Sequence, residues 1–193
     1  MASLPHIMCL VSARDDLSLL PQLTQVGVDG FQVRDKLLDG RALVDLTRHV
    51  LRTGATVVVN DRLDVALAAG ADGVHLGAGD LAVADARRLA PDLLIGVTCR
   101  NRLDIEAAAR AGADYAGFGP IFATTSKAGL PDPLGPSALN DATGVLPVLA
   151  IGGITPGNVG EIPSGIGVAL IGGIWSQADP VAAAARIVEA VRR

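Results

Sequence analysis

The feature that most constrains this chain is a regular alternation of short apolar runs with amphipathic segments. Segments with helical spacing lie at 41–51, 63–69, 104–111 and 181–191. Between such segments, eight β-rich runs recur, at 7–12, 30–34, 56–60, 73–77, 94–99, 115–119, 148–154 and 167–174. The runs are continuously apolar, as expected of parallel strands that are covered on the outside. Eight strands that alternate with helices predict an α/β fold, the (β/α)8 or TIM barrel.

A tripeptide marks the joints between helices and strands. It reads Gly27-Val28-Asp29, Gly70-Ala71-Asp72 and Gly112-Ala113-Asp114. Glycine at this position is the usual left-handed residue that closes a helix before the next strand begins. No linker, charge block or low-complexity segment interrupts the pattern, so residues 1–193 are predicted to form a single barrel domain.

Composition excludes several classes of protein. Half of the residues are hydrophobic but only five are aromatic, so the core must consist mainly of Ala, Val, Leu and Ile. A net charge of −4 without a basic run argues against a nucleic-acid or anionic-membrane binder. The longest apolar stretches are roughly half of a bilayer span, so no membrane partner is expected.

The two cysteines, Cys9 and Cys99, form no CxxC motif or disulfide framework and lie in apolar runs. They are expected to be buried, reduced thiols in a soluble cytoplasmic protein. The predicted outer helices are rich in Ala and Leu, which is compatible with a homo-oligomer.

Polar residues follow the second predicted strand, in the sequence Gln32-Val33-Arg34-Asp35-Lys36. Period-two alternation places Gln32, Arg34 and Lys36 on one side, toward the mouth of the barrel where active sites of this fold lie. Two cations that converge there indicate an anion between them, and a diphosphate accepts many charge-assisted hydrogen bonds. Lysine usage supports this interpretation, because the chain has only two lysines, Lys36 and Lys127, and both lie in predicted strand-to-helix loops.

Two carboxylates follow neighbouring strands. Asp61 comes directly after the third strand, and Asp80 comes shortly after the fourth. Each alone could be a helix N-cap, because a helical pattern follows it. Together they could share one hard cation, since Mg²⁺ takes one or two carboxylates plus phosphate oxygens.

The later loops offer groups that suit phosphate. The segment 120–136 holds Thr124-Thr125-Ser126-Lys127 between glycines and prolines, which is typical of a lid over a phosphorylated ligand. The seventh and eighth strands contain Gly152-Gly153 and Gly172-Gly173, where backbone N–H groups can approach a ligand closely. His75 lies within a strand and is interpreted as a core histidine.

With these segments in order, the chain resembles the thiamine phosphate synthase family. The resemblance covers about residues 30–180. It rests on Gln32-Val33-Arg34-Asp35-Lys36, Asn60-Asp61-Arg62-Leu63-Asp64, Ala71-Asp72-Gly73-Val74-His75-Leu76-Gly77 with Asp80, Gly119-Pro120-Ile121-Phe122, and Ala150-Ile151-Gly152-Gly153-Ile154. It implies a transferase that joins hydroxymethylpyrimidine diphosphate to thiazole phosphate, giving thiamine phosphate and diphosphate.

The resemblance also implies roles for individual residues. The pyrimidine diphosphate would be held by Gln32, Arg34, Lys36, Asn60, Thr98 and Lys127. The thiazole phosphate would be held by Thr124, Ser126, Gly153, Ile171 and Gly172. Asp61 and Asp80 would bind Mg²⁺. Arg34, Lys36 and Lys127 would act in catalysis, which proceeds by dissociative loss of diphosphate and capture of a pyrimidine methylene cation.

Four positions depart from the family pattern. Thr98 and Gly172 stand where the family commonly has serine, Arg100 stands where it commonly has histidine, and the region before the second strand is short. Two alternatives therefore accompany the synthase interpretation. One is a thiazole tautomerase, whose catalytic histidine is expected at position 100. The other is a catalytically idle barrel that binds a thiamine precursor.

Overall fold

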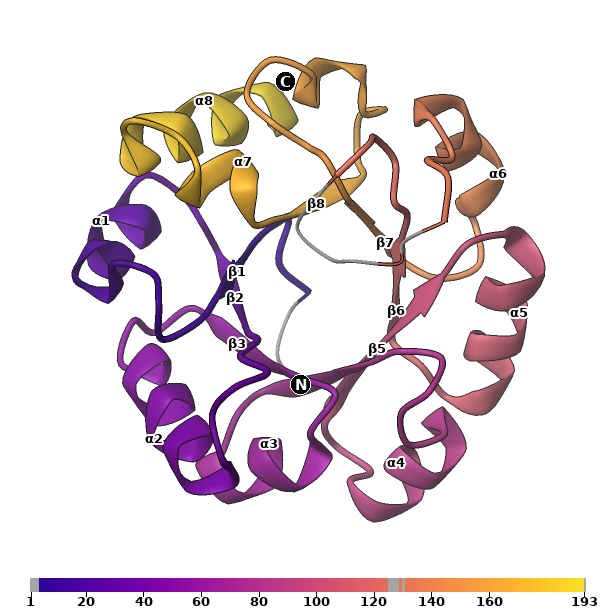
Figure 1. Ribbon diagram of the computed structural model, residues 1–193. Coiled ribbons are helices and arrows are strands. Elements are labelled where there is room, and N and C mark those ends of the chain that lie inside the picture. The colour runs from indigo at the N-terminus through magenta and orange to yellow at the C-terminus, as the bar shows by residue number, and fades with distance from the viewer. Residues whose placement is uncertain (1–3, 125–128, 130, 193) are drawn as a thin grey trace.

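The computed structural model describes residues 4–124, 129 and 131–192. Eight parallel strands close into a barrel in which each strand pairs with its neighbours in sequence and β1 pairs with β8. Figure 1 shows the helices as a ring around these strands. The predicted (β/α)8 barrel is confirmed.

The strands have the order and nearly the extents that the apolar runs predict. They are β1 (Ile7–Val11), β2 (Gly30–Val33), β3 (Thr56–Asn60), β4 (Gly73–Leu76), β5 (Leu94–Cys99), β6 (Tyr115–Phe118), β7 (Val148–Ile151) and β8 (Gly167–Leu170).

The helices are less regular than the strands. The α-helices are α1 (Leu20–Gln25), α2 (Gly40–Leu51), α3 (Leu63–Ala69), α4 (Val83–Leu89), α5 (Arg102–Ala111), α6 (Leu139–Ala142), α7 (Gly172–Trp175) and α8 (Pro180–Val191). Short 3₁₀ helices lie at Leu17–Leu19 (η1), Pro136–Ala138 (η2) and Val159–Glu161 (η3). In the fully described segment between β7 and β8, η3 takes the place of an α-helix. No helix among the described residues is both long and apolar enough to cross a membrane.

The glycine and aspartate of the repeated tripeptide have separate tasks. Gly70 and Gly112 end α3 and α5 in the left-handed conformation, with φ of 74° and 95°. The aspartates then accept hydrogen bonds from the backbone of the second residue of the preceding strand in the barrel. Asp72 binds the backbone N–H of Val57 at 2.8 Å, and Asp114 binds that of Ile95 at 2.7 Å. The motif therefore fastens the strands at the end opposite the mouth.

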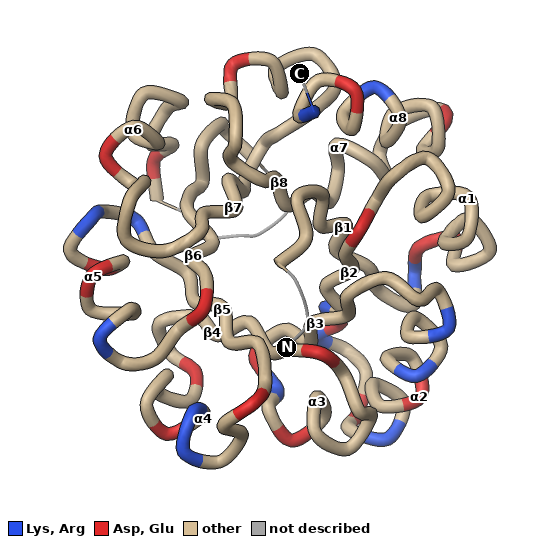
Figure 2. The backbone as a smooth tube through the Cα atoms, turned by 180° about the vertical axis from the view of Figure 1, so that it is seen from behind, with Lys and Arg blue, Asp and Glu red and all other residues tan. Residues whose placement is uncertain are grey.

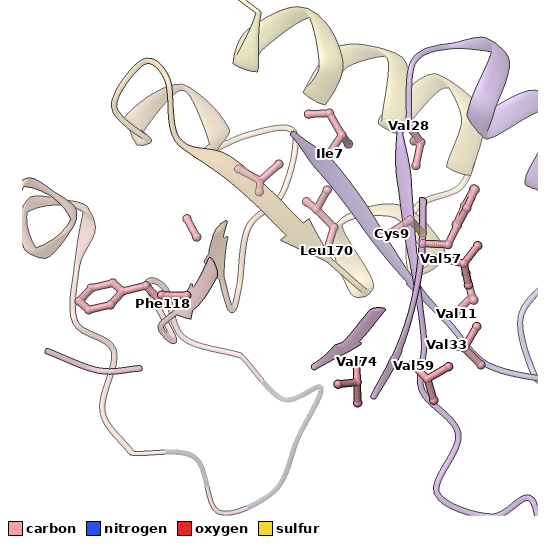
Figure 3. Packing of buried hydrophobic residues seen from close by; sticks show 14 of the residues in the cluster. Ile7, Cys9, Val11, Val28, Val33, Val57, Val59, Val74, Phe118 and Leu170 are labelled. Carbon is pink, nitrogen blue, oxygen red and sulfur yellow. The ribbon is translucent and has the colours of Figure 1, made fainter. Parts of the chain in front are cut away.

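The core has two layers, because successive side chains of a strand point to opposite faces. Side chains between strands and helices form the larger cluster, and Figure 3 shows part of it, with Ile7, Cys9 and Val11 spaced along β1. Both cysteines are free and buried, as predicted. The barrel interior holds a smaller cluster made of Met8, Leu10, Val58, Tyr115, Leu149 and Ala169.

Charged residues lie outside both layers. None of the eight strands contains Asp, Glu, Lys or Arg. Figure 2 shows cations and anions interspersed over the helices and loops. A charged side chain that reaches the barrel mouth therefore comes from a loop that follows a strand.

Candidate active site

A cavity of about 530 Å³ opens at the carboxyl ends of the strands. Eight of the residues singled out in the sequence line it. They are Gln32, Arg34, Asn60, Thr98, Thr124, Gly153, Ile171 and Gly172. A second cavity of about 510 Å³ shares Leu10, Arg34 and Ile171 with the first, and Lys36 lines it. The structure thus brings these predicted residues together at one mouth, with the two cations on the side of β1 and β2.

The conformation after β2 explains how Arg34 and Lys36 reach this place. The N–H of Arg34 continues the strand pairing by donating to the Val11 carbonyl at 2.8 Å. The carboxylate of Asp35 turns back instead and accepts from the backbone N–H groups of Leu37 and Ala13. Burial opposes ionisation of Asp35, but these backbone donors outweigh it and lower the pKa of Asp35. Among the described residues, no carboxylate forms a salt bridge with Arg34 or Lys36 within 4.0 Å.

The carboxylates of Asp61 and Asp80 meet beside these cations. Asp61 adopts φ of 65°, and its N–H donates to the His75 carbonyl at 2.8 Å. Asp80 accepts from the N–H of Gly77 at 2.6 Å. Neither residue is a helix N-cap, because Arg62 and Ala82 occupy those positions in α3 and α4.

The electrostatics of this pair point to a cation. Burial raises the pKa of Asp61, contact with the Asp80 carboxylate raises it further, and Lys36 and Arg34 partly oppose the rise. A hard divalent cation between the two carboxylates would remove their repulsion. The described residues contain no group of three or more His, Cys, Asp or Glu side chains around a common point. Further ligands to such a cation would therefore be water or oxygen atoms of a substrate.

The opposite side of the cavity is built from backbone. Gly152 and Gly153 have φ of 97° and 67°, which an extended strand does not allow. The expected extension of the seventh strand to residue 154 is therefore wrong. The extension of the eighth strand to residue 174 is also wrong, because α7 begins at Gly172.

Contacts fix the backbone at Gly153. A Cβ atom there would lie 2.4 Å from the Ala123 carbonyl oxygen, so only glycine fits without a shift. The side chain of Asn158 donates to the Gly153 carbonyl at 2.9 Å and accepts from the Thr155 N–H at 2.7 Å. Asn158 was not singled out in the sequence, although Asn shortly after a Gly-Gly pair is a common turn signal.

The loop after β6 is held at both ends. The N–H groups of Leu134 and Gly135 donate to the carbonyls of Pro120 and Ile121 at 2.8 and 3.0 Å. Thr124 lines the cavity. The predicted ligands Ser126 and Lys127 lie outside the described residues.

His75 is buried, as the core interpretation predicts, but it also lines the cavity. Its ring lies 3.1 Å from both the Tyr115 hydroxyl and the Thr98 hydroxyl. Sequence reasoning did not include His75 and Tyr115 among the site residues. The signal that could have found His75 is strand register, because His75 pairs with Asn60 and therefore lies level with a predicted ligand.

Comparison with known proteins gives one consistent result. The family model described as thiamine monophosphate synthase matches residues 5–174. The chain is 47% identical over 174 residues to the thiamine-phosphate synthase of Methanoregula boonei, covering 86% of this chain and 81% of that protein. It is 44% identical over 193 residues to the thiamine biosynthesis bifunctional protein ThiM/ThiE of Symbiobacterium thermophilum, covering 95% of this chain and 40% of that protein.

A solved structure agrees with these relatives. Thiamine phosphate pyrophosphorylase from Pyrococcus furiosus superposes with a TM-score of 0.85 at 28% sequence identity. The superposition covers 96% of this chain and 95% of that one.

Proposed function

The chain belongs to the thiamine monophosphate synthase family, and from this premise we propose that it condenses hydroxymethylpyrimidine diphosphate with thiazole phosphate. The products are thiamine phosphate and diphosphate. The observation that carries the proposal is that Arg34 and Lys36 lie near enough to the paired carboxylates of Asp61 and Asp80 to influence the pKa of Asp61. Two cations beside an acidic pair suit a diphosphate that arrives together with a divalent cation.

We assign the two sides of the mouth to the two substrates. Gln32 and Asn60 lie on β2 and β3, next to the cations, and Thr98 lies farther round the barrel on β5. All three line the cavity and would hold the pyrimidine diphosphate. Gly153, Ile171 and Gly172 lie on the side of β7 and β8, where a phosphate commonly binds in this fold. The site would thus place two anionic substrates face to face. Thr124 and Ser126 would be further ligands of the thiazole phosphate, and Lys127 a further ligand of the pyrimidine diphosphate.

The proposed reaction breaks the bond between the pyrimidine methylene carbon and the diphosphate oxygen. The electron pair leaves with diphosphate, and the lone pair of the thiazole nitrogen then bonds to the methylene carbon. Arg34, Lys36 and Lys127 would stabilise the charge that develops on the leaving group. Asp61 and Asp80 would hold Mg²⁺, which supplies further neutralisation of this charge when bound. No step requires a side-chain nucleophile.

The two alternatives are not favoured. The relatives carry the name thiamine-phosphate synthase. The guanidinium of Arg100, at the position where a tautomerase would need histidine, donates to the Asp132 carbonyl at 3.0 Å and so fastens the end of the loop after β6. An idle binder of thiazole phosphate would not need the acidic pair. We place the reaction in the cytoplasm, where buried free thiols such as Cys9 and Cys99 persist.

The proposal is tested by incubating the purified chain with both substrates and Mg²⁺ and quantifying thiamine phosphate and diphosphate by chromatography. The two products are expected in equal amounts, and omission of either substrate should abolish formation of thiamine phosphate. A parallel incubation with the thiazole phosphate carboxylate isomer reports tautomerase activity. Isomerisation without condensation would replace the synthase by the tautomerase.

A further inference from the structure

A chain of hydrogen bonds crosses the interior of the barrel beneath the mouth. It joins side chains from β6, β4 and β5 in the order Tyr115, His75 and Thr98. Gln32 of β2 lies beside Tyr115, and its Nε2 atom is 3.7 Å from Met8 Sδ. Gln32, Tyr115 and His75 are almost completely buried, with 3%, 1% and 7% of their surfaces exposed, whereas Thr98 is exposed at the cavity. A buried polar chain that ends at a cavity wall is costly unless every member has a partner.

The chemistry of the three linked groups gives the chain a direction. Burial keeps the pKa of Tyr115 above its ordinary value, so the phenol retains its proton. The phenol needs an acceptor for this proton, because a buried hydroxyl without one is costly. The Nδ1 atom of His75, 3.1 Å away, is the acceptor that the described contacts offer.

The hydrogen bond between His75 and Thr98 then has a fixed direction as well. A histidine that accepts at Nδ1 and is neutral carries its proton on Nε2. This nitrogen lies 3.1 Å from the Thr98 hydroxyl oxygen, which therefore accepts from it. The proton of the Thr98 hydroxyl is then left to point into the cavity. Thr98 is thus presented to a ligand as a hydrogen-bond donor.

Two glycines make room for the rings. Tyr115 pairs in register with Gly96, and a Cβ at Gly96 would lie 2.0 Å from the Tyr115 ring. A Cβ at Gly117 would lie 2.7 Å from Cε1 of His75. Gly117 pairs in register with Thr98. The missing side chains on β5 and β6 therefore let both rings fill the barrel interior at the height that reaches Thr98.

We propose that His75 and Tyr115 are positioning residues, which orient the Thr98 hydroxyl as a donor to the pyrimidine diphosphate. The proposal rests on the proposed function, since it takes that substrate as the ligand on this side of the mouth. Diphosphate oxygens and pyrimidine ring nitrogens are acceptors, so a hydroxyl fixed as a donor suits them.

The test is a double-mutant cycle on Tyr115 and Thr98. Tyr115→Phe keeps the ring and removes the hydroxyl, so His75 loses its partner at Nδ1. We expect KM for the pyrimidine diphosphate to rise about tenfold, the usual effect of one hydrogen bond, while KM for thiazole phosphate changes less than about twofold. In a Thr98→Val background, Tyr115→Phe should have no further effect, because the hydroxyl that it orients is gone. Thr98→Ser, which keeps the hydroxyl, should restore the dependence on Tyr115.

Two results would overturn the proposal. One is an effect of Tyr115→Phe that is equally large with and without the Thr98 hydroxyl, and the other is an equal rise in both KM values. Gly117→Ala provides an independent check, since it displaces His75 with every hydroxyl retained and should reproduce the selective rise in KM. Product formation by the wild-type chain in the same assay keeps this test separate from the proposed function, which would fail only if the wild type gave no product.

Discussion

The carboxylates of Asp61 and Asp80 contact each other at the barrel mouth, although they follow two different strands and serve as caps of neither α3 nor α4. Such a pair costs free energy in the folded chain and is relieved by a bound cation. Stability and activity should therefore respond in opposite directions when the pair is broken.

Asp61→Asn is expected to abolish Mg²⁺-dependent turnover and to raise the melting temperature of the metal-free chain at neutral pH. Asn also tolerates the left-handed backbone at this position. A hundredfold excess of Mg²⁺ over its Kd should stabilise the wild type by about 2.7 kcal/mol, roughly 5–10 °C in melting temperature, and should leave the variant unchanged. Calorimetric melting with and without Mg²⁺ checks this. Loss of stability in the metal-free variant would make Asp61 a structural residue.

The pH dependence of stability follows from the raised pKa of Asp61. Because the folded chain holds this proton to higher pH than the unfolded chain, the folded state binds more protons between the two pKa values. The stability of the metal-free wild type should therefore fall as pH rises from the ordinary aspartate range through the raised pKa. Across this pH window, the melting temperature should become independent of pH in D61N. It should keep the wild-type dependence on pH in D92N, which alters an exposed aspartate.

Lys36→Met should lower kcat/KM for the pyrimidine diphosphate by about tenfold to a hundredfold, the cost of a lost charge-assisted hydrogen bond. Its effect on KM for thiazole phosphate should be small, because Lys36 lies on the side of β2. Arg110→Met removes one positive charge from the exposed surface of α5 and serves as the control. Equal effects of the two substitutions would reduce the role of Lys36 to net charge.

Gly153→Ala should weaken thiazole phosphate binding at least about tenfold, since the new Cβ must displace the loop that follows β6. Gly70→Ala is the matched control, with φ of 74° and nothing within 4 Å of the new atom. Gly70→Ala should lower the free energy of unfolding by about 1–2 kcal/mol, the strain of a left-handed alanine, and should leave both KM values unchanged. Titration calorimetry with thiazole phosphate measures the affinity of each variant and so distinguishes G153A from G70A. Wild-type affinity in G153A would remove this backbone from the phosphate site.

Asp72→Ala should lower the free energy of unfolding by about 1–3 kcal/mol, because the N–H of Val57 loses its acceptor at the end of the barrel opposite the mouth. Kinetic constants measured well below the melting temperature should not change. Denaturant unfolding combined with steady-state kinetics checks both parts. A large change in KM would show that the two ends of the barrel are coupled.

The sequence predicts the strands well where apolar runs end in polar residues, and less well where they do not. The bounds of β3 and β5 are those predicted, because Asn60 and Cys99 are followed by polar residues. The apolar runs that become β7 and β8 continue to Ile154 and Ile174, so a prediction from hydrophobicity alone makes both strands too long. Positive φ at Gly152 and Gly153 ends the first of these strands, and this property is not visible in an apolar pattern.

Some residues of the candidate site could likewise be predicted from the sequence, and others could not. Residues that follow strands, such as Arg34 and Asp61, could be placed at the mouth because the fold dictates that location. The contact of His75 with Tyr115 could not be predicted, since it depends on closure of the barrel and on the space left by two glycines of other strands. The turn held by Asn158 likewise depends on contacts across the loop.

The most direct test of the proposed metal site is the initial rate of thiamine phosphate formation as a function of Mg²⁺ concentration for the wild type, D61N and D80N. We expect a saturable rise for the wild type, no product in the presence of chelator, and at least about a hundredfold loss of rate for either variant at all Mg²⁺ concentrations. Formation of thiamine phosphate by D61N and D80N at the wild-type rate, or by the wild type with chelator, would contradict it.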